Sequence, residues 1–125
     1  MQEQIRPFAA SAEYYTEERC YINELANIAD DPAVSIVRAR VEPGVATRLH
    51  RLHGITERYV MLAGTGKVEV GSLPTQDVAV GDVVLIPPGC TQRITNTGID
   101  ELLFLAICSP RFQQVAYEDV DQDIL

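Results

Sequence analysis

Two stretches decide the fold, GVATRLHRLHGITERYVMLAG at residues 44–64 and GDVVLIPPGCTQRITN at residues 81–96. Both begin at a glycine, run as short β-rich segments and turn at Gly or Pro. Side chains alternate between the two faces of a strand, so one parity of each run points into the interior of a barrel. We therefore expect His50, Glu57 and Gln92 to converge on one interior point.

The same pattern continues on both sides of these stretches. We expect strands at 34–41, 47–52, 58–62, 66–70, 77–80, 83–86, 92–96 and 102–108. Gly, Pro and Asn turns separate them, and no segment after Val34 keeps a 3.6-residue period. Many short strands at close spacing are typical of an antiparallel sandwich or barrel, so the sequence predicts an all-β domain.

The ends of the chain differ from this central part. Residues 1–33 are polar and rich in turns, with a short strand expected at 20–25, and we interpret them as an N-terminal arm on the barrel or on a partner subunit. Residues 34–112 form the predicted barrel. Residues 113–125 are acidic and are expected to be a loose tail.

Composition limits the class of protein. A chain of 125 residues with 46% apolar content is long enough for one domain with one core. Its net charge of -8 and its scattered basic residues argue against nucleic acid and anionic membranes as partners. Three cysteines without a CxxC pair, no secretory signal and no apolar run long enough to span a membrane predict a cytoplasmic protein with free thiols.

The two stretches resemble the two sequence motifs of the cupin family, over about residues 34–110. The resemblance implies a small antiparallel β-barrel, the double-stranded β-helix or jelly roll, which commonly pairs into a homodimer. In cupins two histidines spaced H-x-H, a glutamate and a distant histidine hold a divalent metal. His50 and Glu57 stand at the first histidine and the glutamate, whereas Leu52 and Gln92 replace the other two histidines.

These replacements leave two interpretations open. In the first, His50, Glu57 and Gln92 hold a divalent transition metal (Zn, Ni, Fe or Mn), and His53 joins them only if a bulge at Gly54 turns it inward. The resemblance then implies a metal-dependent enzyme of the dioxygenase or the isomerase or lyase type. In the second, the cavity is metal-free and polar, and the protein binds a small molecule without catalysis.

Other interior positions are candidates for the cavity wall. Arg48 shares the parity of His50 and could give Glu57 a donor, because an interior carboxyl group must either find a partner or take up a proton. By strand spacing, Tyr59, Met61 and Ile94 are also expected to line the cavity, where they would contact a small-molecule ligand.

Overall fold

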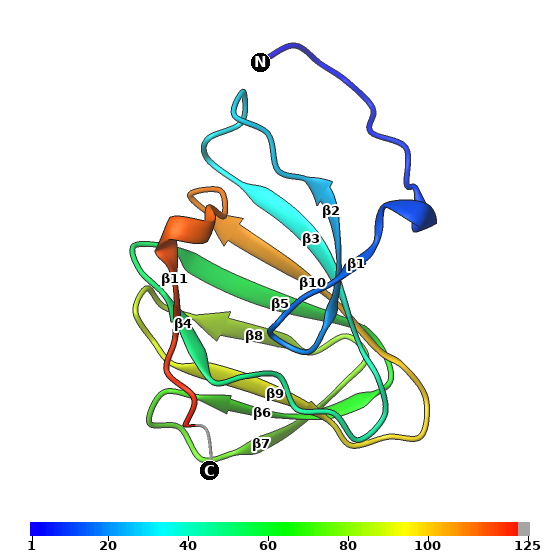
Figure 1. Ribbon diagram of the computed structural model, residues 1–125, viewed down its shortest axis with the longest axis vertical. Helices are drawn as coiled ribbons and strands as arrows, with labels where there is room; N and C mark the ends of the chain where they lie inside the picture. Colours follow the sequence, from blue (N-terminus) through cyan, green and yellow to red (C-terminus); the bar gives the residue numbers. More distant parts are fainter. Residues whose placement is uncertain (123–125) are drawn as a thin grey trace.

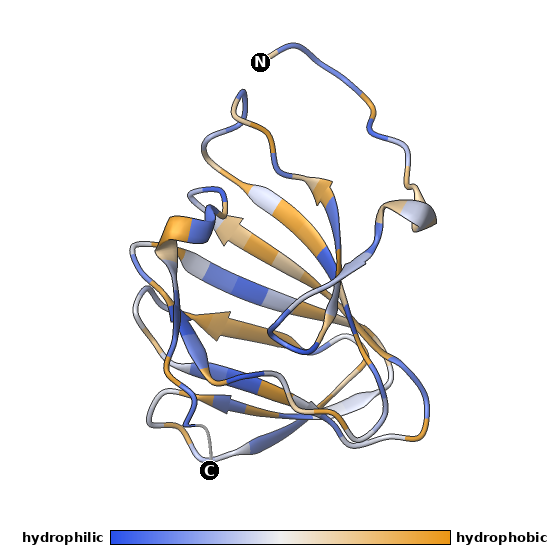
Figure 2. Cartoon of the chain, in the orientation of Figure 1, coloured by the Kyte–Doolittle hydropathy of each residue, from blue (hydrophilic) through white to orange (hydrophobic). Residues whose placement is uncertain are grey.

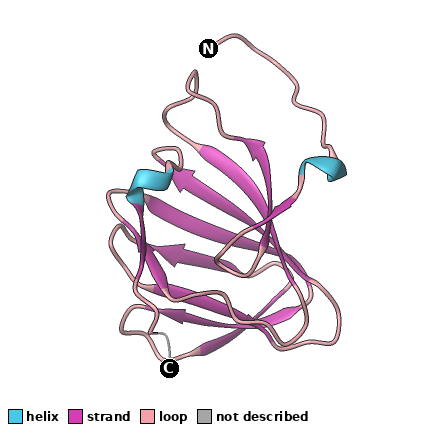
Figure 3. Cartoon of the chain, viewed as in Figure 1, coloured by secondary structure: helices cyan, strands magenta, loops and turns pink. Residues whose placement is uncertain are grey.

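The computed structural model describes residues 1–122 as two antiparallel β-sheets that face each other (Figure 1). The first sheet has the order β1 (Tyr14–Tyr15), β2 (Tyr21–Ala26), β3 (Ser35–Val41), β10 (Leu102–Ser109), β5 (Thr56–Ala63) and β8 (Val83–Ile86). The second has the order β11 (Tyr117–Asp119), β4 (His50–Leu52), β9 (Gln92–Asn96), β6 (Thr65–Val70) and β7 (Gln76–Ala79). Two single 3-10 turns, Ala10–Ala12 and Gln114–Ala116, complete the elements (Figure 3).

This arrangement confirms the predicted all-β jelly roll. The strands of the central region lie within a few residues of their expected ranges, and each pairs antiparallel with its neighbours. The two sheets are hydrogen-bonded separately, so the barrel is open rather than closed. No helix in residues 1–122 is long and apolar enough to cross a membrane.

The core lies between the sheets, because burial alternates along the central strands. Every second residue of β3 and β10 is buried, from Ser35 to Val41 and from Leu102 to Cys108. Figure 2 colours β8 and β10 mostly hydrophobic and β7 mostly hydrophilic. Met61 and Ile94 are at most 1% exposed and fill the space between the sheets. Burying a side chain of this size contributes about 1.5–3 kcal/mol.

One turn depends on glycine. Gly64 joins β5 to β6 with φ of +84°, and a Cβ atom there would lie 2.7 Å from the carbonyl oxygen of Glu101. An L side chain would therefore meet both backbone strain and a collision with main chain.

Both ends of the chain take part in the sheets. β2 pairs with β3 and β1 with β2, so the second half of the N-terminal arm extends the first sheet (Figure 1). The expectation of a loose tail was wrong for its described part, since β11 pairs with β4. Two carboxylates fix this pairing. Asp119 accepts a hydrogen bond from Arg48, and Asp121 accepts one from the Leu49 amide. Residues 123–125 of the predicted tail lie outside the described residues.

Candidate functional site

A cavity of about 480 Å³ lies at one end of the space between the sheets. Its wall on the first sheet is mainly apolar and includes Val37, Ala39, Phe104 and Ala106. The second sheet, which supplies His50, Tyr117 and Asp119, and the turn before β2 contribute many of the polar groups. A cavity of this size can enclose a small organic molecule.

The tautomer of His50 is fixed by the backbone. The ring is 3% exposed on β4, and its Nδ1 lies 2.7 Å from the carbonyl oxygen of Arg48. A carbonyl can only accept a hydrogen bond, so Nδ1 carries the proton. The other ring nitrogen, Nε2, lies 3.2 Å from Oε1 of Glu18. The ring also stacks on Tyr117, with centroids 5.0 Å apart, and its orientation is therefore held from three sides.

Glu18 reaches His50 from the turn between β1 and β2. The Arg48 amide donates to the Glu18 carbonyl at 3.2 Å, and the Thr16 hydroxyl donates to the Cys20 carbonyl at 2.9 Å. The first bond holds the turn against the segment that leads into β4, and the second closes the turn itself. Burial, with a smaller contribution from the charge of Asp119, raises the pKa of Glu18 to about 7.

The electrostatics favour a neutral pair. Burial lowers the pKa of His50, whereas that of Glu18 is raised. Near neutral pH Glu18 is therefore present in both forms: its protonated form donates to Nε2 of an uncharged His50, and its ionised form can accept a proton. The pair is suited to give and to take one proton.

Glu57 lies on the opposite wall, on β5, and is 8% exposed. Burial, reinforced by the charge of Glu18, raises the pKa of Glu57 to about 7. Its Oε2 accepts a long contact, 3.6 Å, from the Cys108 thiol, and the side-chain amide of Gln92 lowers the pKa of the carboxyl group against the larger effect of burial. In residues 1–122, neither Oε1 of Glu57 nor Nε2 of Gln92 has a hydrogen-bond partner. The expectation that Arg48 supplies this carboxyl group with a donor was wrong.

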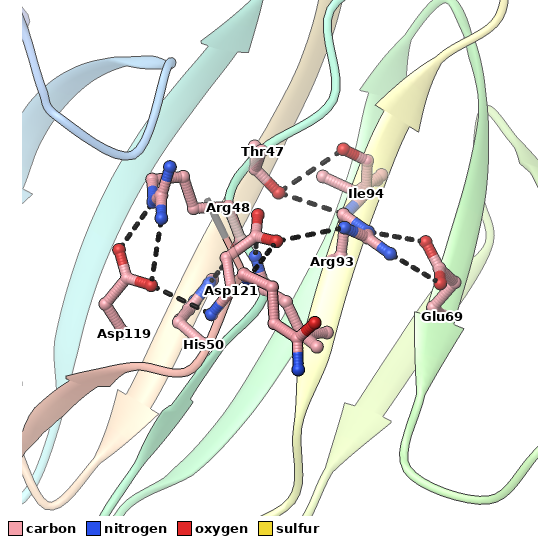
Figure 4. A network of polar contacts seen from close by, with 10 residues as sticks. Thr47, Arg48, His50, Glu69, Arg93, Ile94, Asp119 and Asp121 are labelled. Atoms are coloured by element: carbon pink, nitrogen blue, oxygen red, sulfur yellow. Dashed lines mark hydrogen bonds and ion pairs between the residues drawn. The ribbon is translucent and has the colours of Figure 1, made fainter. Parts of the chain in front are cut away.

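Arg48 instead contacts the tail, as part of a charged network along β4 and β9 (Figure 4). Its Nε lies 2.5 Å from Asp119, and the pKa of Asp119 is lowered by this hydrogen bond. Arg93 of β9 contacts Glu69 at 2.7 Å and Asp121 at 3.7 Å. The network borders the cavity at Asp119 and braces the strand that carries His50.

The remaining residues that the sequence suggested for the site lie at the cavity wall, in the core or at the surface. Tyr59 lines the cavity, and its hydroxyl donates to Oε1 of Gln92, which ties β5 to β9. Burial holds the pKa of Tyr59 well above its ordinary value. Met61 and Ile94, expected at the cavity wall, lie in the core instead because the two sheets close on each other there. The side chain of His53 is 57% exposed, and its Nε2 lies 2.9 Å from Glu118.

The residues do not fit a cupin metal centre. Leu52 stands in the cavity wall in place of an imidazole, the carbonyl of Gln92 already accepts from Tyr59, and Nε2 of His50 faces Glu18. Burial raises the pKa of the cavity thiols Cys20 and Cys108, which disfavours the thiolate form that binds a metal. Within residues 1–122 no group of three or more His, Cys, Asp or Glu side chains could hold a metal ion.

The sequence matches the family model described as Cupin domain over residues 37–108. The chain belongs to the cupin family. This cupin has the same fold as an uncharacterized conserved protein with a double-stranded β-helix domain from Klebsiella pneumoniae. That match has a TM-score of 0.77 and 13% identity, and it covers 95% of this chain and 100% of the other. Comparison with the curated protein sequences gives no match.

Two further solved structures are similar to this cupin. PAC13 from Streptomyces, solved with uridine, has a TM-score of 0.77 at 15% identity, covering 97% of this chain and 93% of that one. Pac13 is described as a nucleoside dehydratase. KdgF from a Halomonas species has a TM-score of 0.70 at 17% identity, covering 80% of this chain and 88% of that one. At these identities the similarity is one of fold.

Sequence reasoning missed Glu18. It lies in the region interpreted as an arm, far from His50 along the chain, and no spacing in the sequence links the two. The adjacent pair Glu17–Glu18 before a short strand was the one available signal, and such pairs are usually solvated. Only the folding of the turn onto β4 brings the carboxyl group to the imidazole.

Proposed function

We propose that this cupin binds a small organic molecule between its sheets and catalyses proton transfer on it without a metal, as an isomerase or a lyase. The observation that carries the proposal is the 3.2 Å contact between Nε2 of His50 and Oε1 of Glu18 in the cavity wall. A general acid or base works best when its pKa lies near the working pH, and the pKa of Glu18 is about 7.

The His50–Glu18 pair can catalyse isomerisation or dehydration by moving a single carbon-bound proton. With Glu18 ionised, it takes a proton from a carbon next to a carbonyl group, and His50 shares that proton through Nε2. In an α-hydroxy carbonyl compound, return of the proton to the former carbonyl carbon, with the hydroxyl proton passing from one oxygen to the other, gives an isomer. Transfer of the proton to a leaving hydroxyl group instead releases water and leaves a double bond. The Arg48 carbonyl stabilises His50 in either state, because Nδ1 donates to it throughout.

Two observations support this reaction class. The ligand set of a cupin metal centre is incomplete, so the acid–base groups are the reactive groups of the cavity. In addition, a protein of the same fold is named a nucleoside dehydratase, and loss of water is a proton-transfer reaction. These points support a lyase or isomerase over a dioxygenase.

The test uses the complete protein in D₂O with EDTA and a panel of α- and β-hydroxy aldehydes and ketones, with and without an amino group. Proton NMR follows exchange of the carbon-bound hydrogen and loss of water. We expect exchange or elimination on at least one member, reduced at least about 100-fold in His50→Gln and in Glu18→Gln. His53→Gln is the matched control, since its side chain is exposed and outside the cavity, and it should retain the activity.

Two results would overturn the proposal. Reaction that appears only when a divalent metal is added would restore the metal-dependent interpretation. Binding of panel members without exchange or elimination would identify a non-catalytic small-molecule-binding cupin, the alternative that the replacements at Leu52 and Gln92 also support.

A further inference from the structure

The charged side chains that line the cavity are all acidic. Its residues include five carboxyl groups, at Glu17, Glu18, Glu24, Glu57 and Asp119, and among the described residues no Lys or Arg lines it. Arg48 compensates Asp119 from outside the cavity. The remaining four carboxyl groups have no cation in the lining, and the net charge of the chain is -8. A phosphate or carboxylate ligand would therefore meet repulsion both on approach and when bound.

A second observation points to what the cavity accepts. Glu57 is 92% buried, since 8% of its surface is exposed, and its Oε1 has no hydrogen-bond partner in the described part of the chain. A buried acceptor without a donor is costly, and the cost is removed when a ligand supplies an N–H group. A cationic N–H donor satisfies the oxygen and also favours its ionised form.

The rest of the wall suits the body of such a ligand. Aromatic rings from Tyr14, Tyr59, Phe104, Phe112 and Tyr117 surround the cavity, next to the aliphatic side chains of β3. The face of an aromatic ring attracts an organic cation, and its apolar surface packs against hydrocarbon. Tyr14 also donates to Glu24 at 3.3 Å, so a ring and a carboxylate lie together on β1 and β2.

We infer that the cavity binds an organic ammonium compound, an amine with a small apolar or aromatic body, and that Glu57 is its buried counter-ion. This inference rests on the proposed function, because it assumes that the cavity receives a small molecule. Under it, the His50–Glu18 pair is left free for proton transfer while Glu57 holds the charged nitrogen. The substrate would thus be an amine-bearing hydroxy or carbonyl compound.

The experiment compares three probes of similar shape and different charge: 2-phenylethylamine, 2-phenylethanol and 3-phenylpropanoate. Isothermal titration calorimetry at pH 7.5 with EDTA measures the affinity of the full chain for each. We expect the amine to bind at least about tenfold more tightly than the alcohol, and the carboxylate to bind more weakly than both.

The variants assign the preference to a residue. Glu57→Gln keeps the shape of the side chain and should weaken amine binding about thirtyfold or more, with little effect on the alcohol. Glu18→Gln at the cavity wall should weaken it less. Asp77→Asn is the matched control for net charge, since its side chain is 85% exposed on β7, and it should bind all three probes as the unmodified chain does.

Three outcomes would overturn the inference: an alcohol or carboxylate that binds as tightly as the amine, no binding of any probe, or an amine affinity unchanged in Glu57→Gln. Each is distinguishable from failure of the proposed function. The D₂O reaction is scored on hydroxy carbonyl compounds with and without nitrogen and depends on His50 rather than on Glu57.

Discussion

Replacing Glu57 by Gln should change how stability depends on pH, because this carboxyl group is buried without a cation. Its pKa is raised from 4.5 to about 7, chiefly by burial. The folded protein therefore holds this proton more tightly than the unfolded chain does. The associated stability is complete below about pH 4.5 and is lost as the pH rises through 7. At about 1.4 kcal/mol per pKa unit, the loss reaches about 3 kcal/mol above pH 8.

The assay is urea denaturation of both proteins from pH 5.5 to pH 9, followed by circular dichroism because the chain has no Trp. About 2 kcal/mol of the loss falls within this range, which also avoids the sequence pI of about 4.6. The amide introduced by Glu57→Gln cannot ionise, so the variant should gain about 2 kcal/mol of unfolding free energy relative to the original chain between the two ends. A difference that stays constant with pH, or that moves the other way, would refute an unpaired buried carboxyl group at this position.

Two further predictions concern the scaffold, both measured by urea denaturation. Gly64→Ala should destabilise the protein by about 2–4 kcal/mol, because the added Cβ meets the Glu101 carbonyl at positive φ. Gly44→Ala, at φ of +77° in open space, should lose only about 1–2 kcal/mol, and equal losses would argue against the collision. Thr47→Val should lose about 1–3 kcal/mol, because the Thr47 hydroxyl both donates to and accepts from the backbone of Ile94 (Figure 4). An unchanged midpoint would mean that these two bonds contribute little.

The fold could be predicted because local signals agree with the global arrangement. Turn residues such as Gly64 and Gly81 stand where the backbone has positive φ, and strand parity correctly placed His50 and Glu57 in the interior. These features depend on a few neighbouring residues. The homodimer and the cytoplasmic location depend on contacts and signals beyond one chain, and they stay predictions.

The site was harder to predict because long-range contacts assemble it. Glu18 contacts His50 because the turn between β1 and β2 packs next to β4. Asp119, in the C-terminal tail, accepts a hydrogen bond from Arg48, which lies 71 residues earlier in the sequence. Parity gives the face of a strand but not the distance to the opposite sheet. For that reason Ile94, which has the interior parity, lies in the packed core rather than at the cavity wall.

The central claim is that the cavity works without a metal, and metal content tests it most directly. The chain would be purified without an affinity tag, incubated with Zn²⁺, Ni²⁺, Fe²⁺ or Mn²⁺, desalted and analysed for metal. A Leu52→His, Gln92→His variant, which restores the cupin ligand set, serves as the positive control after circular dichroism shows that it folds. We predict far less than one metal ion per chain in the original protein and about one in the variant. A near-stoichiometric metal in the original protein that disappears in His50→Ala would contradict the account.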